Sequence, residues 1–504
     1  MKRVYFKKPI VAYAVLAVLA ILVIALVVDM ALGGFKTGWK LWEKQYDGCS
    51  YDLELTLDPE NHKLYGTMDF KYKNTEDGPM DALCMLLYAN SFRDAGYGAI
   101  AQDEFDMAYP NGFSFGGIDI ESVTSGGKEL SYTIEGSQDN EMWITLPKAL
   151  PVGAGIGIEI KYTVTIPNCL GRFGYGDNTI SIANCNPILA VFDNNAFYNY
   201  PYYPMGDPFY SEIADYSATV FVPEDYDIAF TGHIEKETVR DGMKQYTVDA
   251  PARRDFAFVA SDKFTIAEGE AGGATVRSYY FAPDFIGKFA LEAGVRALDI
   301  FSTLYGAYAY DDFNIVETDF YIGGMEYPGM VMIDTSVYSA RYAGVCEMVI
   351  AHEAAHQWWY AAVGNDQVAE PWLDEALAEF STMMYFRNRY GQDGQAMCQQ
   401  YVLDTYDTLG TILREELEAE DYDIDMATTE FDDSYIYSYM VYGMGARMFD
   451  ELREELGDEA FFDVMSGYYR DHLYSIVDRE DLELAFEERI GTDFTTWFDV
   501  QLKE

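Results

Sequence analysis

Residues 349–359 constrain the chain most, because they set two histidines and a glutamate in a metal-binding spacing. His352 and His356 are four residues apart, so a helix carries both imidazoles on one face, one turn apart, as a divalent metal ion requires. Glu353 can reach a metal-bound water without itself binding the metal, which is the general-base position of zinc hydrolases. The chain has only five histidines, so this spacing is improbable by chance. The alternative is an amphipathic helix whose histidines only cap a core.

A catalytic zinc ion normally has three protein ligands, and we expect the third on a neighbouring helix. Glu375 lies 19 residues after His356, within residues 372–380. This separation lets the first helix end near residues 364–365 and a second helix return past the metal. Glu379, one turn later, either orients a ligand imidazole or is a surface carboxylate. The pattern therefore predicts one zinc ion per chain, held by two histidines and Glu375.

The N-terminus carries a second constraint. Residues 1–8 include four positive charges, and residues 9–28 form an uninterrupted apolar run. A helix of that length spans about 30 Å, the thickness of the hydrocarbon core of a bilayer. We therefore expect residues 1–28 to form a cytoplasmic basic tail and a single transmembrane anchor, with the rest of the chain outside the cytoplasm. A cleaved signal peptide is the alternative, but the run is long and no small-x-small cleavage site follows it.

The net negative charge of the chain excludes one class of binding partner. Residues 29–504 hold all 84 Asp and Glu residues but only 30 of the 34 Lys and Arg residues, so their formal charge is about −54. Nucleic acid is excluded, because a phosphate chain needs a basic footprint. The acidity indicates a solvated, self-repelling surface, with a mild preference for basic peptides as the second interpretation.

The six cysteines have no Cys-x-x-Cys spacing, so they do not indicate a zinc ribbon. Disulfides can form outside the cytoplasm. Cys169 and Cys185 bracket a loop rich in Gly and Asn and are the first pair to suspect, although six cysteines allow 15 connectivities.

Hydrophobic periodicity divides the remaining chain into two parts. Residues 51–58 alternate apolar and polar side chains, and residues 64–72 repeat the alternation after a turn, which predicts a hairpin. Similar short runs follow at residues 142–146, 156–164, 216–223 and 255–260, and they predict a β-sandwich-like domain of roughly 200 residues. After residue 284 the pattern becomes helical. We expect a helix at residues 285–307, a strand at 313–316, mainly helices from Ala343 onward, and a solvated acidic loop at 415–433.

The two metal-binding segments resemble a known zinc signature. His-Glu-Ala-Ala-His-Gln-Trp at residues 352–358, with Trp-Leu-Asp-Glu at 372–375, is similar to the signature of the aminopeptidase N family of gluzincins, which includes leukotriene hydrolase. Gly-Gly-Met-Glu-Tyr-Pro at residues 323–328 resembles that family's Gly-x-Met-Glu-Asn motif. The likeness covers most of residues 45–504. It implies a short, membrane-anchored, bacterial-type member that lacks the C-terminal helical domain of larger relatives.

By that resemblance, Glu326 binds the free α-amine of a peptide, and Gly323, Gly324 and Met325 complete the substrate-binding motif. A carboxylate beside the metal pairs with an ammonium group, so cleavage is counted from the N-terminus. The alternative is a simple turn, because Gly-Gly and Tyr-Pro are turn formers.

The resemblance also assigns a role to Tyr442. Residues 442–447 are similar to the family's Tyr-x-Lys-Gly-Ala run, whose tyrosine donates a hydrogen bond to the oxyanion. A phenol stays protonated at neutral pH and can stabilise this charge. Met444 stands where lysine is usual, and a core aromatic is the alternative.

Two further departures limit the resemblance. Tyr327 replaces the common asparagine of the Met-Glu-Asn motif. Residues 193–196 lie where relatives have Gln-x-Glu-Ala or Gln-x-Gln-Ala, so the second amine-binding group is Asn195, or Asp193, or absent. With no C-terminal helical domain to enclose the site, strict exopeptidase action follows less firmly than hydrolysis.

These observations predict a multidomain α+β fold. The expected parts are residues 1–28 (tail and transmembrane helix), 29–46 (linker), 47–265 (β domain) and 266–504 (thermolysin-like, mainly helical zinc peptidase domain). The expected protein is a zinc metallopeptidase, an aminopeptidase acting on peptides outside the cytoplasm from the cell membrane. The alternatives are a zinc endopeptidase with an open cleft and a non-catalytic surface binding protein on the same fold. Glu353 and Tyr442 are the expected catalytic groups.

Overall fold

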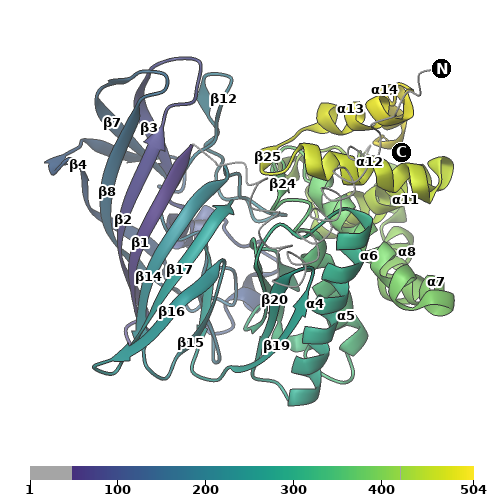
Figure 1. Ribbon diagram of the computed structural model, residues 1–504, viewed down its shortest axis with the longest axis horizontal. Helices are drawn as coiled ribbons and strands as arrows, with labels where there is room; N and C mark the ends of the chain where they lie inside the picture. The colour runs from purple at the N-terminus through teal and green to yellow at the C-terminus, as the bar shows by residue number, and fades with distance from the viewer. Residues whose placement is uncertain (1–47, 420–421, 504) are drawn as a thin grey trace, which may run out of the picture. The chain divides into compact units, whose positions relative to one another are not determined.

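The computed structural model describes residues 48–419 and 422–503, and the chain divides into the units Met1–Gln45 and Tyr46–Glu504. The expected basic tail, anchor and linker lie outside the described residues. Within those residues, no helix has both the length and the apolar character to cross a membrane. In the second unit, a β-rich N-terminal part precedes a mainly helical C-terminal part (Figure 1). The expected α+β class is therefore confirmed in outline.

An eight-stranded sheet dominates the β-rich part, with the predicted hairpin of β1 (Cys49–Asp58) and β2 (Lys63–Lys73) at its centre. Alternate residues of β1 are buried, as its sequence pattern predicts. β1 also pairs in parallel with β14. In order, the strands are β16 (His233–Arg240), β17 (Met243–Arg253), β14 (Ala214–Pro223), β1, β2, β8 (Gly155–Thr165), β4 (Gly117–Ser125) and β5 (Lys128–Glu129).

Two four-stranded sheets complete this part and share one apolar core with the large sheet, as in a layered β fold. The first sheet has the order β15 (Asp227–Phe230), β18 (Phe258–Ser261), β10 (Ile180–Ile182), β9 (Gly174–Tyr175), and the second has the order β11 (Ile188–Leu189), β3 (Met80–Leu86), β7 (Glu141–Leu150), β6 (Tyr132–Glu135). The strand expected at residues 255–260 begins only at Phe258. Asp255 is buried and binds Asn184 and Tyr360 through its side chain, so this stretch connects to the helical part instead.

A five-stranded sheet contributes side chains to the apolar cores of both parts. Its order is β19 (Thr265–Ala271), β20 (Ala274–Tyr280), β21 (Asp312–Thr318), β23 (Met330–Asp334), β22 (Gly324–Met325). In β23, Met330 and Met332 face the β-rich core, whereas Val331 and Ile333 face the helical core, because successive side chains point to opposite faces. Residues 46–504 are one compact unit, so the boundary at 265/266, at the start of β19, stays a prediction.

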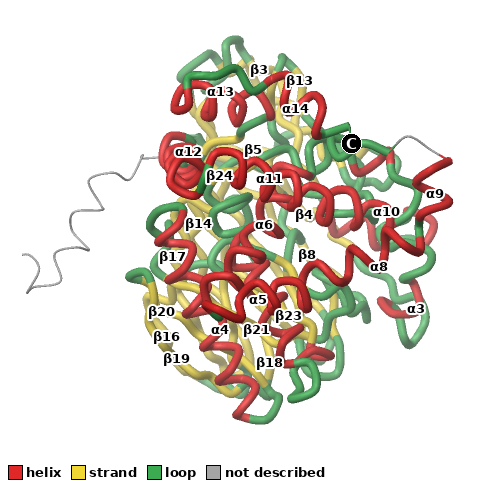
Figure 2. The backbone as a smooth tube through the Cα atoms, turned by 90° about the vertical axis from the view of Figure 1, so that its right-hand side faces the viewer, coloured by secondary structure: helices red, strands yellow, loops and turns green. Residues whose placement is uncertain are grey.

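Helices α4 (Asp284–Leu304) and α5 (Ala343–Ala355) cover one face of this sheet (Figure 2). α4 confirms the helix expected at residues 285–307. It approaches the sheet closely at Gly294, where a β-carbon would lie 2.2 Å from the side chain of Ile315. Glycine therefore allows the contact that fixes α4, and with it α5, on the sheet.

The helix α3 (Phe105–Ala108) lies in the β-rich part, and the remaining helices of the C-terminal part pack around α6 (Trp372–Arg389) or follow it. They are α7 (Gly394–Cys398), α8 (Asp404–Ile412), α9 (Arg414–Ala419), α10 (Ser434–Tyr437), the π-helical turn η8 (Ser438–Met444), α11 (Gly445–Leu456), α12 (Asp458–Asp471), α13 (Arg479–Ile490) and α14 (Thr495–Gln501). α9 lies where an acidic loop was expected to begin, so that expectation is wrong for its first residues.

Two further expectations are wrong. α5 ends at Ala355, well before residues 364–365, and the chain then turns sharply at Tyr360, whose φ is +110°. All six cysteines lie in the described part of the chain and are free. The thiol of Cys169 faces the hydroxyl of Tyr109, not the thiol of Cys185.

Candidate active site

Two consecutive helices position the predicted metal ligands. His352 lies in the last turn of α5, His356 caps its C-terminus, and Glu375 lies in the first turn of α6. Ala351 and Ala355 of α5 are fully buried. Helix α5 contacts both α6 and the strands β22 and β23 of the sheet.

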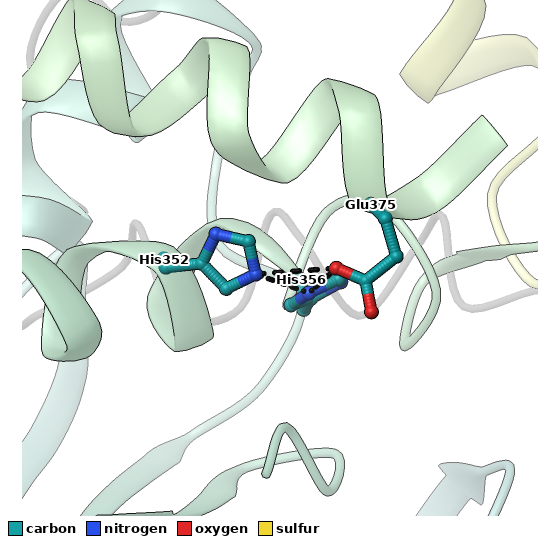
Figure 3. A group of neighbouring side chains, drawn as sticks. All are labelled: His352, His356 and Glu375. Carbon is teal, nitrogen blue, oxygen red and sulfur yellow. Dashed lines mark hydrogen bonds and ion pairs between the residues drawn. The ribbon is translucent and has the colours of Figure 1, made fainter. Parts of the chain in front are cut away.

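The ligand atoms converge on one point (Figure 3). The two Nε2 atoms of His352 and His356 are 3.1 Å apart, and each lies 3.2 Å from Oε2 of Glu375. Zinc bonds of about 2.0–2.1 Å give tetrahedral edges of about 3.3 Å, so the triangle has the size that zinc needs.

The outer ring nitrogens fix the state of these histidines. Nδ1 of His352 lies 2.8 Å from the carboxylate of Glu379, and Nδ1 of His356 lies 3.1 Å from the carbonyl oxygen of Trp359. Each acceptor holds a proton on Nδ1, which leaves Nε2 as the atom that can bind a metal. Once zinc displaces any proton from Nε2, two lone pairs and a carboxylate oxygen converge on one point, and this donor set fits a zinc ion.

The carboxylates around the site stabilise the protonated form of the histidines. Burial lowers the pKa of His356, but Glu326 and Glu375 outweigh it and raise that pKa to about 10. Burial raises the pKa of Glu375, but the two histidines outweigh it and hold the pKa below its usual value. Zinc binding at this site consequently displaces protons from the histidines.

Glu379 resolves the choice left open by the sequence. It is only 3% exposed and binds His352, so it is not a surface carboxylate. Its other oxygen accepts a hydrogen bond of 2.9 Å from Tyr406. The chain from Tyr406 through Glu379 fixes the ring of His352 against the metal site.

Glu353 lies beside the metal ligands with its carboxylate directed toward β22. A β-carbon on Gly324 would lie 2.0 Å from Oε1 of Glu353, so a larger residue at that position would displace this carboxylate or the strand. Burial raises the pKa of Glu353 to about 8, with His352 opposing the shift and Glu326 adding to it. A carboxylate that exchanges its proton near neutral pH has the property that general bases need.

Tyr442 approaches the site from η8. Its hydroxyl donates a 2.6 Å hydrogen bond to Oε1 of Glu375, and its ring stacks on His352 at a centroid distance of 5.7 Å. π-helical turns often occur at functional sites. Here the turn brings a phenol hydroxyl to the edge of the predicted metal site.

Glu326 follows β22 and is 3% exposed. Its Oε1 accepts a 3.2 Å hydrogen bond from Gln367. Gln357 holds the backbone that follows, because its Oε1 accepts from the N–H of Gly329 at 2.7 Å and its Nε2 donates to the carbonyl of Glu326 at 3.3 Å. Burial and the nearby Asp207 raise the pKa of Glu326 to about 7.

The residues next to Glu326 in its motif each suit their position for a different structural reason. Gly323 has φ of +87°, a conformation that favours glycine. Met325 is buried, and its sulfur contacts Nε of Arg172 at 2.9 Å. Tyr327, which replaces the family's asparagine, is fully buried and donates to Asn184, so it ties this loop to the β-rich part.

The structure places Asn195 away from these groups. It is exposed, with φ of +63°, in the turn between β12 (Phe192–Asp193) and β13 (Ala196–Phe197). Within the described residues it has no hydrogen bond to the site. The predicted role for Asn195 therefore has no geometric support, because the hairpin turns this segment outward.

The second acidic group near Glu326 is Asp207, which the sequence analysis missed. It is 6% exposed and pairs with Nη2 of Arg172 at 2.5 Å. Burial raises its pKa to about 7, with Arg172 opposing the shift. Pro-Met-Gly-Asp-Pro around Asp207 resembles an ordinary turn, so only the fold reveals its neighbours.

Comparisons with known proteins agree with this geometry. Residues 289–500 match the peptidase family M1 domain. Aminopeptidase M1-B of Oryza sativa subsp. japonica is 25% identical over 385 residues, which cover 73% of this chain and 43% of that protein. Aminopeptidase N of Lactococcus lactis subsp. lactis is 26% identical over 239 residues, which cover 43% of this chain and 26% of that protein. The chain thus spans less than half the length of these curated relatives.

A solved structure shares the whole fold. The crystal structure of an M1 zinc metallopeptidase from Deinococcus radiodurans has a TM-score of 0.62 at 18% identity and covers 91% of this chain and 94% of that chain. A mutant of that protein was solved with a Tyr-Ser-Ala substrate. The likeness shows that a β-rich part followed by a helical part is the architecture of M1 peptidases.

Proposed function

Because the chain belongs to the aminopeptidase N family of gluzincin metallopeptidases, we propose that it is a zinc aminopeptidase that removes N-terminal residues from peptides. One observation carries the proposal. Carboxylate oxygens of Glu326 and Glu353 and a ring nitrogen of His356 all lie within 4.8 Å of one another. A buried anion for an α-ammonium group thus lies beside the base and a metal ligand.

The chemistry divides among the residues of the site. One zinc ion, held by His352, His356 and Glu375, would supply an activated water and a polarised scissile carbonyl. Glu353 accepts the proton of the attacking water and passes it to the leaving amine. Tyr442 turns its hydroxyl from Glu375 toward the oxygen of the scissile carbonyl and stabilises the charge that develops there.

The edge strand β22 gives the substrate its direction. β22 is the last strand of its sheet and pairs only with β23. An extended peptide can add to such an edge. A peptide antiparallel to β22 has its N-terminus at Glu326 and its first peptide bond beside Gly324 and Glu353. Glu326 therefore limits cleavage to the first bond by binding the free amine.

The test compares aminoacyl fluorogenic amides with their N-acetylated forms, using the full chain loaded with zinc in mild detergent. Cleavage of the free-amine set alone supports an aminopeptidase. Cleavage of both sets overturns the exopeptidase assignment in favour of an endopeptidase with an open cleft. Cleavage of neither set, with one zinc bound per chain by metal analysis, overturns both and leaves a binding protein on the same fold.

We also propose that the protein is anchored in the cell membrane by residues 9–28, with its site outside the cytoplasm. The apolar run and the basic residues before it support this proposal. The test is membrane fractionation of the full chain beside a chain that starts at Asp29, with protease added to intact cells. Recovery of the full chain in the soluble fraction would contradict the anchor.

A further inference from the structure

A surface pocket lies between residues 95–105 and Pro204, outside the catalytic groups. We propose that it binds the downstream part of a peptide substrate, namely an apolar side chain next to a basic one. The inference rests on the proposed peptidase function and adds to it a preference several residues past the cleaved bond. The cavity has a volume of about 450 Å³, within the range of about 300–1,000 Å³ that is typical of ligand sites.

The walls of the pocket are mostly apolar. Ile100, Phe105 and Pro204 line it and are only half-buried, so they offer apolar surface to a ligand. Phe113 lies nearby, in the wall of an adjoining smaller cavity, and is 41% exposed. Contiguous exposed apolar surface of this kind marks binding sites on soluble proteins.

Two connections join the pocket to the substrate end of the site. Glu104, in the segment that forms one wall, hydrogen-bonds to Tyr321, which lies five residues before Glu326. Pro204, in the other wall, precedes Asp207 by three residues, and Arg172 links Asp207 to Met325. Both walls are therefore attached to the segment that receives the substrate.

The direction in which a peptide would bind along β22 also leads toward this pocket. A peptide antiparallel to β22, with its N-terminus at Glu326, passes Gly323 and then Tyr321. The part of the peptide beyond the cleaved bond consequently runs toward Tyr321, which hydrogen-bonds to Glu104 in the segment that forms one wall of the pocket.

The negative charge near the pocket indicates which peptide side chains it would bind. Residues 94–106 contain four acidic residues and no lysine or arginine, and Arg93, which precedes them, pairs with Asp119. Asp94, Asp103 and Asp106 are exposed next to residues that line the pocket. Carboxylates near an apolar pocket favour a peptide with a basic residue next to an apolar one.

The first experiment measures kcat/KM for the peptides Leu-Gly-Gly-Phe-Lys, Leu-Gly-Gly-Phe-Glu and Leu-Gly-Gly-Gly-Gly with the zinc-loaded full chain. We expect the Phe-Lys peptide to exceed the Gly-Gly peptide about tenfold, with Phe-Glu between them, because one well-placed apolar contact is worth about a factor of ten. Equal values for the three peptides would overturn the inference, even with an active aminopeptidase.

Matched variants locate this preference. Ala95→Trp fills the pocket from an exposed position, and Asp103→Lys reverses one exposed charge next to the lining residue Gln102. We expect the Phe-Lys to Gly-Gly ratio to fall to about one in Ala95→Trp and to about three in Asp103→Lys. Val152→Trp, at a position 56% exposed in the β-rich part, keeps the tenfold ratio. A ratio that survives in Ala95→Trp would overturn the inference.

A binding measurement separates this inference from the proposed function. Calorimetry with zinc-loaded Glu353→Gln measures peptide affinity without cleavage. About tenfold tighter binding of Leu-Gly-Gly-Phe-Lys than of Leu-Gly-Gly-Gly-Gly supports the pocket, even where the native chain cleaves neither peptide and the proposed function fails. Equal affinities overturn the pocket and leave the proposed function untouched.

Discussion

The metal end of the site and its substrate end are built from different kinds of structure. The predicted zinc ligands come from the consecutive helices α5 and α6. By contrast, the groups near the substrate come from separate segments: Glu326 after the edge strand β22, Asp207 in a long connection of the β-rich part, and Tyr442 in η8. The metal end depends on local spacing, whereas the substrate end depends on how the two parts of the fold pack.

This difference has a physical consequence for substitutions. At the metal end, each imidazole has a fixed outer partner, so a change there acts through zinc binding. At the substrate end, Glu326 and Asp207 are buried carboxylates whose pKa values are raised to about 7, so a change there acts through charge and substrate affinity. Substitutions at the two ends should therefore separate zinc content from turnover.

The largest effect on activity is expected at Glu353, which lies between the metal end and the substrate end of the site. Glu353→Gln removes the base but no metal ligand, so kcat should fall by about 10²–10⁴-fold while zinc content stays at one per chain. Glu375→Gln should lose the zinc as well. The measurements are initial rates and zinc analysis by atomic absorption. Full activity in Glu353→Gln with zinc intact would refute the role of this residue.

The next effect tests how closely β22 approaches the base. Gly324→Ala puts a β-carbon 2.0 Å from Oε1 of Glu353, so the carboxylate or the strand must move. A shift of about 1 Å costs about 100-fold in kcat/KM, with zinc content unchanged. Gly157→Ala in β8 is the control, because nothing lies within 4 Å of its β-carbon. Equal activity of both variants would show that the strand is not in contact with the base.

A smaller effect is expected at the amine end. Glu326→Gln removes one charge-assisted contact, worth about 1.5–3 kcal/mol, so KM for free-amine substrates should rise by about 10- to 100-fold. N-acetylated peptides, measured as competitive inhibitors because they are not cleaved, should show no such change in Ki. The test compares KM for the free-amine peptides with Ki for their acetylated forms, and an equal rise in both constants would contradict amine binding by Glu326.

The pH dependence of that contact has a definite sign. Burial raises the pKa of Glu326 to about 7, so below pH 7 the group is protonated and cannot pair with an ammonium. The KM advantage of the native chain over Glu326→Gln should therefore shrink about tenfold per pH unit below 7. Above about pH 8 it should shrink again, as the α-amine of the substrate loses its proton. A ratio that stays constant from pH 5 to 9 would exclude this ion pair.

The smallest effect is expected on zinc affinity, when the hydrogen bond that supports Glu379 and His352 is removed. Tyr406→Phe removes the hydrogen bond to Glu379 that steadies His352, so zinc should bind about tenfold more weakly, at the lower end of the range for such partners. Competition with a chelator measures this change. Tyr439→Phe, a nearby half-buried tyrosine, is the control. Equal zinc affinity in both variants would mean that Glu379 is held without Tyr406.

Much of the local structure could be predicted from sequence because its signals are local. The alternation in residues 51–58 and 64–72 predicted the central hairpin, and the helical pattern predicted α4. The spacing of His352, His356 and Glu375 predicted three side chains that converge in the structure. In each case, the periodicity of a strand or helix fixes which side chains share a face.

The errors arise where the backbone turns or where distant segments meet. Buried Trp358 and Trp359 resemble a continuing helix, yet the chain turns at Tyr360. Asn195 was one of the alternatives for the second amine-binding group, and it lies in an exposed turn, so its role stays a prediction. Cys169 and Cys185 bracket one loop, although the fold directs Cys169 toward Tyr109 instead.

The sequence by itself determined the chemistry of this protein, because a helix carries residues four apart on one face whatever surrounds it. The same applies to the apolar alternation that builds the central hairpin. Only the tertiary structure decided that Asp207 and Arg172 lie by Glu326, that Gly324 lies against Glu353, and that Tyr321 hydrogen-bonds to the segment that forms one wall of the pocket. These contacts join segments far apart in the chain, and their positions follow from the packing of two cores on one shared sheet.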